Sequence, residues 1–245
     1  MNKTFCPVSV LSAAALLTVS LAQAQSVTVN NNSFGAQVLT SGQTIGEAAP
    51  TDWTGFNVGG GGTLGSGYDY GITYANGTDF TDPLAAPASG NNYLWVNRWN
   101  GNGTQVAGVY QDVGALAADT TYTLTVAIGQ RAGSGPGPNG SWSPGIISLL
   151  NGTDNTGTVM ATGGGQPTTP NSWEDFTASF TTGATVSGDL TVELSVLDAP
   201  SIQSDFSNVE LTAQAVPEPG TYALLAAGLA LMPFITRRRR QVAVQ

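Results

Sequence analysis

Hydrophobic and polar residues alternate strictly in two stretches of the chain, 121–128 and 190–196. A period of two places the apolar residues on one face of a β-strand and the polar residues on the other. The pattern therefore predicts two half-buried strands that contribute to one core. The residues expected in that core are Tyr122, Leu124, Val126, Leu190, Val192 and Leu194.

Weaker runs of the same kind are separated by turn-forming pairs such as Asn151-Gly152. No window between residues 26 and 214 shows the spacing of an amphipathic helix. The pattern predicts an all-β fold, a single β-sandwich or jelly roll with a signal peptide before it and a C-terminal transmembrane sorting helix after it. The additional strands are expected at 53–58, 70–74, 93–99, 106–113, 145–150, 158–162, 176–180 and 207–213.

Residues 1–24 have the three parts of a secretory signal peptide. Lys3 supplies the positive start, residues 8–21 are apolar, and Ala22-Gln23-Ala24 is a small-residue cleavage site. A permanent N-terminal anchor is the alternative, but this apolar stretch is too short to span a bilayer. We expect export through the Sec translocon and cleavage by signal peptidase after Ala24.

The C-terminal end changes composition a second time after the expected ectodomain, 25–215. The motif 216–220 contains Pro217, Glu218 and Pro219, and the uncharged segment 220–236 reaches the lower length limit of a membrane-spanning helix. Basic residues beside a span stay in the cytoplasm, so residues 241–245 form a cytoplasmic tail and the ectodomain lies outside. The basic cluster is Arg237, Arg238, Arg239 and Arg240.

The order of these parts, a Pro-Glu-Pro triplet, a span rich in Leu, Ala and Gly, and an Arg cluster, resembles the PEP-CTERM sorting signal of Gram-negative bacteria that make extracellular polysaccharide. The resemblance covers residues 216–240. It implies an intermediate anchored in the inner membrane, cleavage near the triplet by an exosortase, and delivery to the cell surface or extracellular matrix. A permanent single-pass anchor is the alternative.

Charge and residue content exclude several classes of function. Between Gln25 and Ala215 only Arg98 and Arg131 stand against fifteen carboxylates, so a nucleic-acid groove is excluded. The chain has no histidine, and its single cysteine, Cys6, lies in the signal peptide. Ser-His-Asp triads, histidine metal sites and thiol chemistry are therefore excluded from the mature protein.

Short motifs at 32–34, 111–114, 120–126 and 206–211 resemble the galactose-binding-like jelly roll, a fold shared by several carbohydrate-binding modules. The resemblance implies that the first and last strands lie side by side. Members often bind a structural calcium there, but Gly35 and Ser207 occupy the places of the usual carboxylates. We expect no cofactor. Calcium is the alternative, with candidate ligands Asp205 and Asn208.

The expected strand at 93–99 carries aromatic side chains on one face, opposite Leu94 and Val96. If those two enter the core, the aromatic face forms an exposed platform for exopolysaccharide; the alternative is that the aromatics belong to the core. Trp142, after a loop rich in Gly and Pro, is a ligand clamp or a loop anchor, and the two arginines are salt-bridge partners or orient an acidic saccharide. The candidate ligand-binding residues are Trp95, Trp99, Trp142, Arg98 and Arg131.

Catalysis in this chain would depend on carboxylates. Glu174, Asp175 and Glu193 are candidates for the acid and base of a glycoside hydrolase or lyase, which needs two carboxyl groups at roughly 5 to 10 Å. Their spacing shows no convergent pair. We therefore expect a non-catalytic surface or matrix protein, and a carboxylate-dependent hydrolase is the alternative.

Overall fold

The computed structural model describes residues 23–40, 43–46, 48–58, 70–75, 86–88, 90–98, 106–132, 142–196 and 202–217, together with residue 227. Most of the expected signal peptide and all but one residue of the expected span, 220–236, lie outside these ranges. No helix among the described residues has the length and apolar character needed to cross a membrane.

The described residues from 23 to 217 form strands, turns and bends, with no helix among them. All ten strands expected from the sequence are present, so the all-β prediction is confirmed. Two short strands, β1 and β2, were not predicted. The strands are β1 (Gln25–Val27), β2 (Thr44–Gly46), β3 (Thr54–Val58), β4 (Tyr70–Tyr74), β5 (Asn92–Arg98), β6 (Val106–Ala115), β7 (Thr120–Gln130), β8 (Gly145–Asn151), β9 (Thr158–Gly165), β10 (Ser172–Thr181), β11 (Asp189–Val196) and β12 (Ile202–Ala215).

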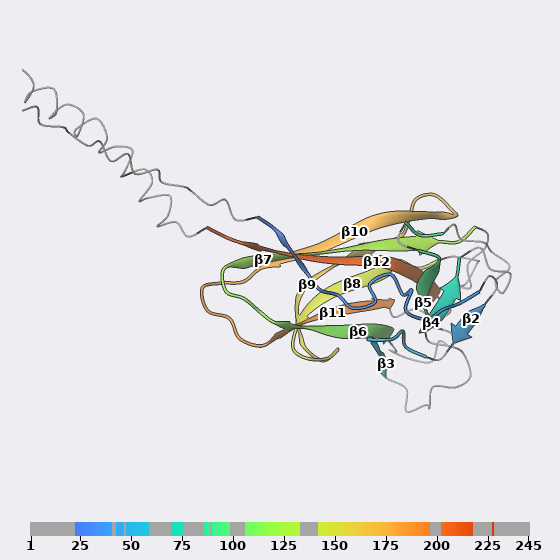
Figure 1. Ribbon diagram of the computed structural model, residues 1–245, viewed down its shortest axis with the longest axis horizontal. Helices are drawn as coiled ribbons and strands as arrows, with labels where there is room; N and C mark the ends of the chain where they lie inside the picture. Colours follow the sequence, from blue (N-terminus) through green and yellow to red (C-terminus); the bar gives the residue numbers. More distant parts are fainter. Residues whose placement is uncertain are drawn as a thin grey trace, which may run out of the picture.

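These strands make two antiparallel sheets packed in two layers, as Figure 1 shows. The seven-stranded sheet has the order β10-β7-β12-β5-β4-β2, with β1 paired to β12. The five-stranded sheet has the order β3-β6-β11-β8-β9. Sequence neighbours are often not sheet neighbours, so most strand pairs join distant parts of the chain.

The core lies between the two sheets and contains the six residues predicted from the alternating stretches. Leu124, Val126, Val192 and Leu194 are fully buried, and Tyr122 and Leu190 are nearly so. Burial of each such side chain stabilises the fold by about 1.5–3 kcal/mol. The alternation seen in the sequence therefore corresponds directly to the inner faces of β7 and β11.

The first and last strands lie side by side, as the jelly-roll resemblance implied. Gln25 pairs with Ala213 and Val27 pairs with Leu211 in antiparallel register. The expected signal-peptide cleavage site and the expected sorting motif therefore lie at the same end of the sandwich.

A side-chain amide also joins this N-terminal segment to the body. Gln111 Oε1 accepts a hydrogen bond from the Asn30 N–H at 2.7 Å. Its Nε2 donates to the backbone oxygens of Asn30, at 3.0 Å, and Asp52, at 2.9 Å. One buried side chain on β6 thus fixes two neighbouring chain segments.

Candidate functional site

The outer face of the seven-stranded sheet is buried at one end, although outer faces of a sandwich usually meet solvent. Leu94 and Val96 on β5 are fully buried in the main core. The intervening residues Tyr93 and Trp95 face the other way and form a second buried cluster with Ala75, against which Trp173 packs. The expected split of β5 into an aliphatic and an aromatic face is confirmed.

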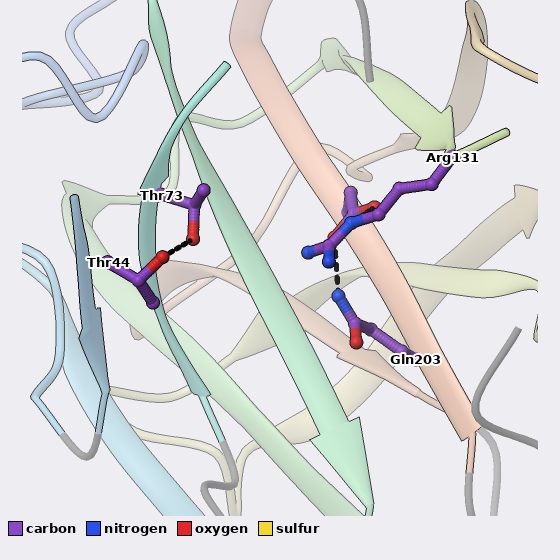
Figure 2. Close-up of polar contacts among 5 residues, drawn as sticks. Thr44, Thr73, Arg131 and Gln203 are labelled. Carbon is purple, nitrogen blue, oxygen red and sulfur yellow. Dashed lines mark hydrogen bonds and ion pairs between the residues drawn. The ribbon is translucent and has the colours of Figure 1, made fainter. Parts of the chain in front are cut away.

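An ion pair lies on this outer face. Arg131, just after β7, donates from Nε to Asp205 Oδ2 and from Nη2 to Asp205 Oδ1, both at 3.2 Å. Gln203 Nε2 also donates to Asp205 Oδ1, at 2.9 Å (Figure 2). Arg131 is 1% exposed and Asp205 is fully buried, so neither charge is solvated by bulk water. Figure 2 also shows the 3.0 Å contact between Thr44 and Thr73, which joins β2 to β4.

Two aromatic rings flank the guanidinium of Arg131. Its Cζ lies 5.5 Å from the ring centroid of Tyr93 and 5.6 Å from that of Trp142. Such cation–π contacts are worth about 2 kcal/mol when they are desolvated. Arg131 therefore links the end of β7, the carboxylate on β12, the ring from β5 and the segment before β8.

The strand register places glycines between the large rings. On the outer face Trp95 lies opposite Asp205, Asp205 lies opposite Gly129, and Gly129 lies opposite Trp173. Gly71 is the other neighbour of Trp95, and a Cβ added to it would come within 2.5 Å of the Trp95 ring. The missing side chain of Gly71 leaves the space that the Trp95 ring occupies.

Aromatic rings from β5 and β10, which are not neighbouring strands, meet above the outer face of β12 and β7. The ring centroids of Tyr93, on β5, and Trp173, on β10, are 5.8 Å apart in an edge-to-face arrangement. Both β12 and β7 run between those strands. This contact accounts for the burial of the small outer-face residues Ser207 and Ala127.

Burial changes the acid–base properties of this face. It raises the pKa of the Asp205 carboxyl above its ordinary value, while the charge of Arg131 opposes the rise. Burial likewise raises the pKa of the Tyr93 phenol, and the negative charge of Asp205 adds to that rise. Tyr93 therefore stays neutral at physiological pH.

Buried polar atoms without a hydrogen-bond partner occur on the described outer face. Asn97, opposite Gln203, has such an atom in its Oδ1, and Ser207, two residues beyond Asp205, has one in its Oγ. Such atoms are rare, because an unsatisfied buried polar group costs about 1–3 kcal/mol. We call this region the outer-face site and define it by Tyr93, Trp95, Asn97, Arg131, Trp142, Trp173, Gln203, Asp205 and Ser207.

Three of the five predicted ligand-binding residues, Trp95, Arg131 and Trp142, lie in the outer-face site. Trp99 and the side chain of Arg98 fall outside the described residues. Of the two alternatives for the aromatic face, the structure has packed aromatics and not an exposed platform, because Trp95 is 3% exposed and Trp142 is 8% exposed. The rings pack on each other and on Arg131 instead of facing solvent.

The sequence reasoning missed Gln203 and Trp173. Gln203 alternates with Asp205 and Ser207, a polar pattern that is typical of a solvent-facing strand surface. Trp173 lies on an edge strand, and only the register of β10 with β7 brings it to the site. No signal in the sequence distinguishes this buried polar face from an exposed one.

Asp205 was proposed as a calcium ligand, but both of its oxygens accept hydrogen bonds from protein donors. The other candidate, Asn208, donates from Nδ2 to Glu210 Oε1 at 3.3 Å. The described residues contain no group of three or more acidic, histidine or cysteine side chains placed so that they could hold a metal ion.

The hydrolase candidates are separated by the fold. Glu174 and Asp175 are consecutive residues of β10, so they point to opposite faces of the seven-stranded sheet. Glu193 lies on β11, in the other sheet, where it accepts a hydrogen bond from Ser195 Oγ at 3.1 Å. The described fold brings no pair of these three carboxylates together.

The sequence of the two-sheet sandwich matches a known family of proteins. Residues 25–212 match the family model described as HpiC1 cyclase, so the chain belongs to the HpiC1-like family. Residues 215–240 match the PEP-CTERM protein-sorting motif, so the chain is an exported protein sorted through the membrane of a Gram-negative bacterium. No curated protein sequence matches the chain.

Solved structures of cyclases from Fischerella have the same fold. The Stig cyclase FisC from Fischerella sp. TAU, in complex with (3Z)-3-(1-methyl-2-pyrrolidinylidene)-3H-indole, is 24% identical with a TM-score of 0.65, covering 80% of this chain and 100% of that one. An apo cyclase from Fischerella sp. is 24% identical with a TM-score of 0.64, and the match covers 80% of this chain and 98% of that one. A cyclase from Fischerella sp. TAU in complex with 4-(1H-indol-3-yl)butan-2-one is 24% identical with a TM-score of 0.65, and the match covers 79% of this chain and 100% of that one.

Proposed function

We propose that the chain is a non-catalytic protein of the cell surface or extracellular matrix that binds a ring-shaped ligand at the outer-face site. The first ligand class is a sugar ring of the surrounding exopolysaccharide. The observation that carries the proposal is the pair of buried, unpartnered polar atoms, Asn97 Oδ1 and Ser207 Oγ, among aromatic rings. Ligand sites are typically apolar surfaces with a few polar groups that fix orientation.

The chemistry of the site favours a neutral ligand. The charges of Arg131 and Asp205 neutralise each other, and Arg131 is also held between two rings. A charged ligand would have to break this pair or remain unpaired in an apolar environment, which is costly. A sugar ring presents C–H groups to Trp95 and hydroxyl groups to Asn97 and Ser207, so it matches both kinds of surface.

The absence of turnover is part of the proposal. It is supported by the separate placement of Glu174, Asp175 and Glu193, since hydrolysis of a glycosidic bond needs two facing carboxyl groups. The residues directly across from Asp205 on the two neighbouring strands are Trp95 and Gly129, and neither carries a carboxylate.

A second candidate function is acid-catalysed cyclisation of a small aromatic substrate. It is favoured by membership of the HpiC1-like family and by the position of Asp205, a buried carboxyl group among aromatic rings, since a positioned carboxyl group can transfer a proton in a reaction. The two Fischerella cyclase complexes contain indole compounds, and the aromatic rings of the outer-face site would suit a flat ligand of that kind.

Tryptophan fluorescence titration tests the first candidate, with oligosaccharides cut from the host's exopolysaccharide as the probe. Ser207→Ala should weaken binding severalfold, because it removes a buried hydroxyl from the site. Ser204→Ala is the matched control: Ser204 Oγ is also buried without a partner, but it faces Gly145 of the other sheet. The absence of a saturable signal, or equal effects of both variants, would refute the binding proposal.

The two candidates differ in the fate of the ligand. Incubation with 4-(1H-indol-3-yl)butan-2-one and with the oligosaccharides, followed by mass spectrometry, reports any chemical change. Binding without change supports the first candidate. Conversion that Asp205→Asn abolishes, while the variant still folds, supports the second.

A further inference from the structure

The sorting motif follows the folded domain without a linker. Its match begins at Ala215, which is also the last residue of β12. The next residue, Val216, donates its backbone N–H to the carbonyl oxygen of Asp119 at 2.7 Å. Val216 is the residue immediately before the Pro-Glu-Pro triplet, so the domain itself holds the start of the motif.

The residue that holds Val216 is itself braced. The N–H of Asp119 donates to the Gly183 oxygen at 3.0 Å. In the same turn, Thr182 Oγ1 donates to the Ala117 oxygen at 2.7 Å, and the Ala117 N–H donates to Tyr122 Oη at 2.8 Å. Tyr122 belongs to the main core, so a chain of hydrogen bonds connects the motif to the interior.

Chain length limits how far the motif can move from this contact. An extended residue spans at most about 3.3–3.6 Å, so Pro217 to Pro219 reach no more than about 10 Å from Val216. The expected membrane span begins one residue later. A membrane-embedded peptidase that cuts near the triplet must therefore work within a short gap between the folded end and the bilayer.

We propose that the contact between Val216 and Asp119 restrains the sorting motif, so that the exosortase cuts the chain only while this contact is open. The reaction is the cleavage of one peptide bond near the triplet. Its acyl part passes to water or to an amine acceptor, and its amine leaves with the span. The folded domain, as well as the motif, would then set the processing rate.

Val216→Pro tests the contact directly, because proline lacks the N–H that Asp119 accepts. The matched control is Val216→Ala, which shortens an exposed side chain and keeps the N–H. In a pulse-chase experiment on the full chain in an exosortase-bearing host, Val216→Pro should be processed about fivefold faster. That factor corresponds to about 1 kcal/mol, the net worth of one hydrogen bond. Val216→Ala should keep the original rate.

A second variant inserts Gly-Ser-Gly-Ser between Ala215 and Val216, and its control carries the same four residues after Gln245. The first insertion should speed processing and the second should not. A host without the exosortase separates this cut from general proteolysis. Unchanged or slower processing of Val216→Pro, or equal acceleration of Val216→Ala, overturns the proposal.

Discussion

Arg131 and Asp205 lie 74 residues apart in the chain, yet two 3.2 Å hydrogen bonds join their side chains. Both side chains are buried from solvent. The pair joins the end of β7 to the start of β12, and the rings of Tyr93 and Trp142 enclose the guanidinium. A buried pair of this kind specifies one arrangement of its surroundings, because each charge would be strongly destabilising without the other.

Breaking the pair from either side should therefore destabilise the domain. We expect Arg131→Met and Asp205→Leu each to lower the free energy of unfolding by about 3–5 kcal/mol, since each leaves an unpaired buried charge. The double variant should lose less free energy of unfolding than the sum of the losses in the two single variants. Urea unfolding of all four proteins gives the coupling energy. Additive losses would show that the two residues act independently.

The stability of the domain should depend on pH through Glu193. Burial raises the pKa of Glu193, against a smaller opposing effect of the hydrogen bond from Ser195. The folded state then binds a proton more strongly than the unfolded state, so stability falls as pH rises from the ordinary value of 4.5 to the raised value. Urea unfolding between pH 4 and pH 8 should show this fall, and Glu193→Gln should reduce it. An identical slope in both proteins would contradict the assignment.

Gly71 should not tolerate a side chain. A Cβ there would lie 2.2 Å from the Ile45 oxygen and 2.5 Å from the Trp95 ring. We expect Gly71→Ala to cost about 1–3 kcal/mol and to shift the tryptophan emission. Gly183→Ala, where a Cβ meets open space, is the control and should change stability by less than about 1 kcal/mol. Thermal unfolding distinguishes them, and equal midpoints would refute the packing argument.

Gln111 should be needed for the attachment of the N-terminal segment. Gln111→Met removes all three hydrogen bonds that the amide makes to the backbone of Asn30 and Asp52. The expected loss is on the order of 3 kcal/mol. Gln25→Met, at an exposed position on β1, should be neutral. Hydrogen exchange at residues 27–34 should rise in the first variant alone.

The strands were predictable because their inner faces are continuous and apolar. Leu190 to Val196 alternates without interruption, and this local pattern alone determines which face is buried. β1 was not predictable, because Gln25-Ser26-Val27 has no pattern of its own and becomes a strand by pairing with β12. Its formation depends on contacts almost two hundred residues away.

The site was predictable only as a set of separate residues. Trp95, Trp142 and Arg131 were candidates from their residue types, but nothing local connects them to Asp205. The crossing of Tyr93 and Trp173 over two intervening strands also depends on the strand order β10-β7-β12-β5. That order is a property of the whole fold, so a search for local motifs cannot find it.

β12 runs along the sandwich and carries Asp205 near its beginning and Val216 just after its end (Figure 1). The two residues are eleven positions apart along extended chain, which is about 36 Å at about 3.3 Å per residue. The outer-face site therefore lies at the end of β12 that is remote from the sorting motif. On the proposed function, a ligand is therefore captured at the end of the domain remote from the sorting motif, and capture does not have to wait for the chain to be released.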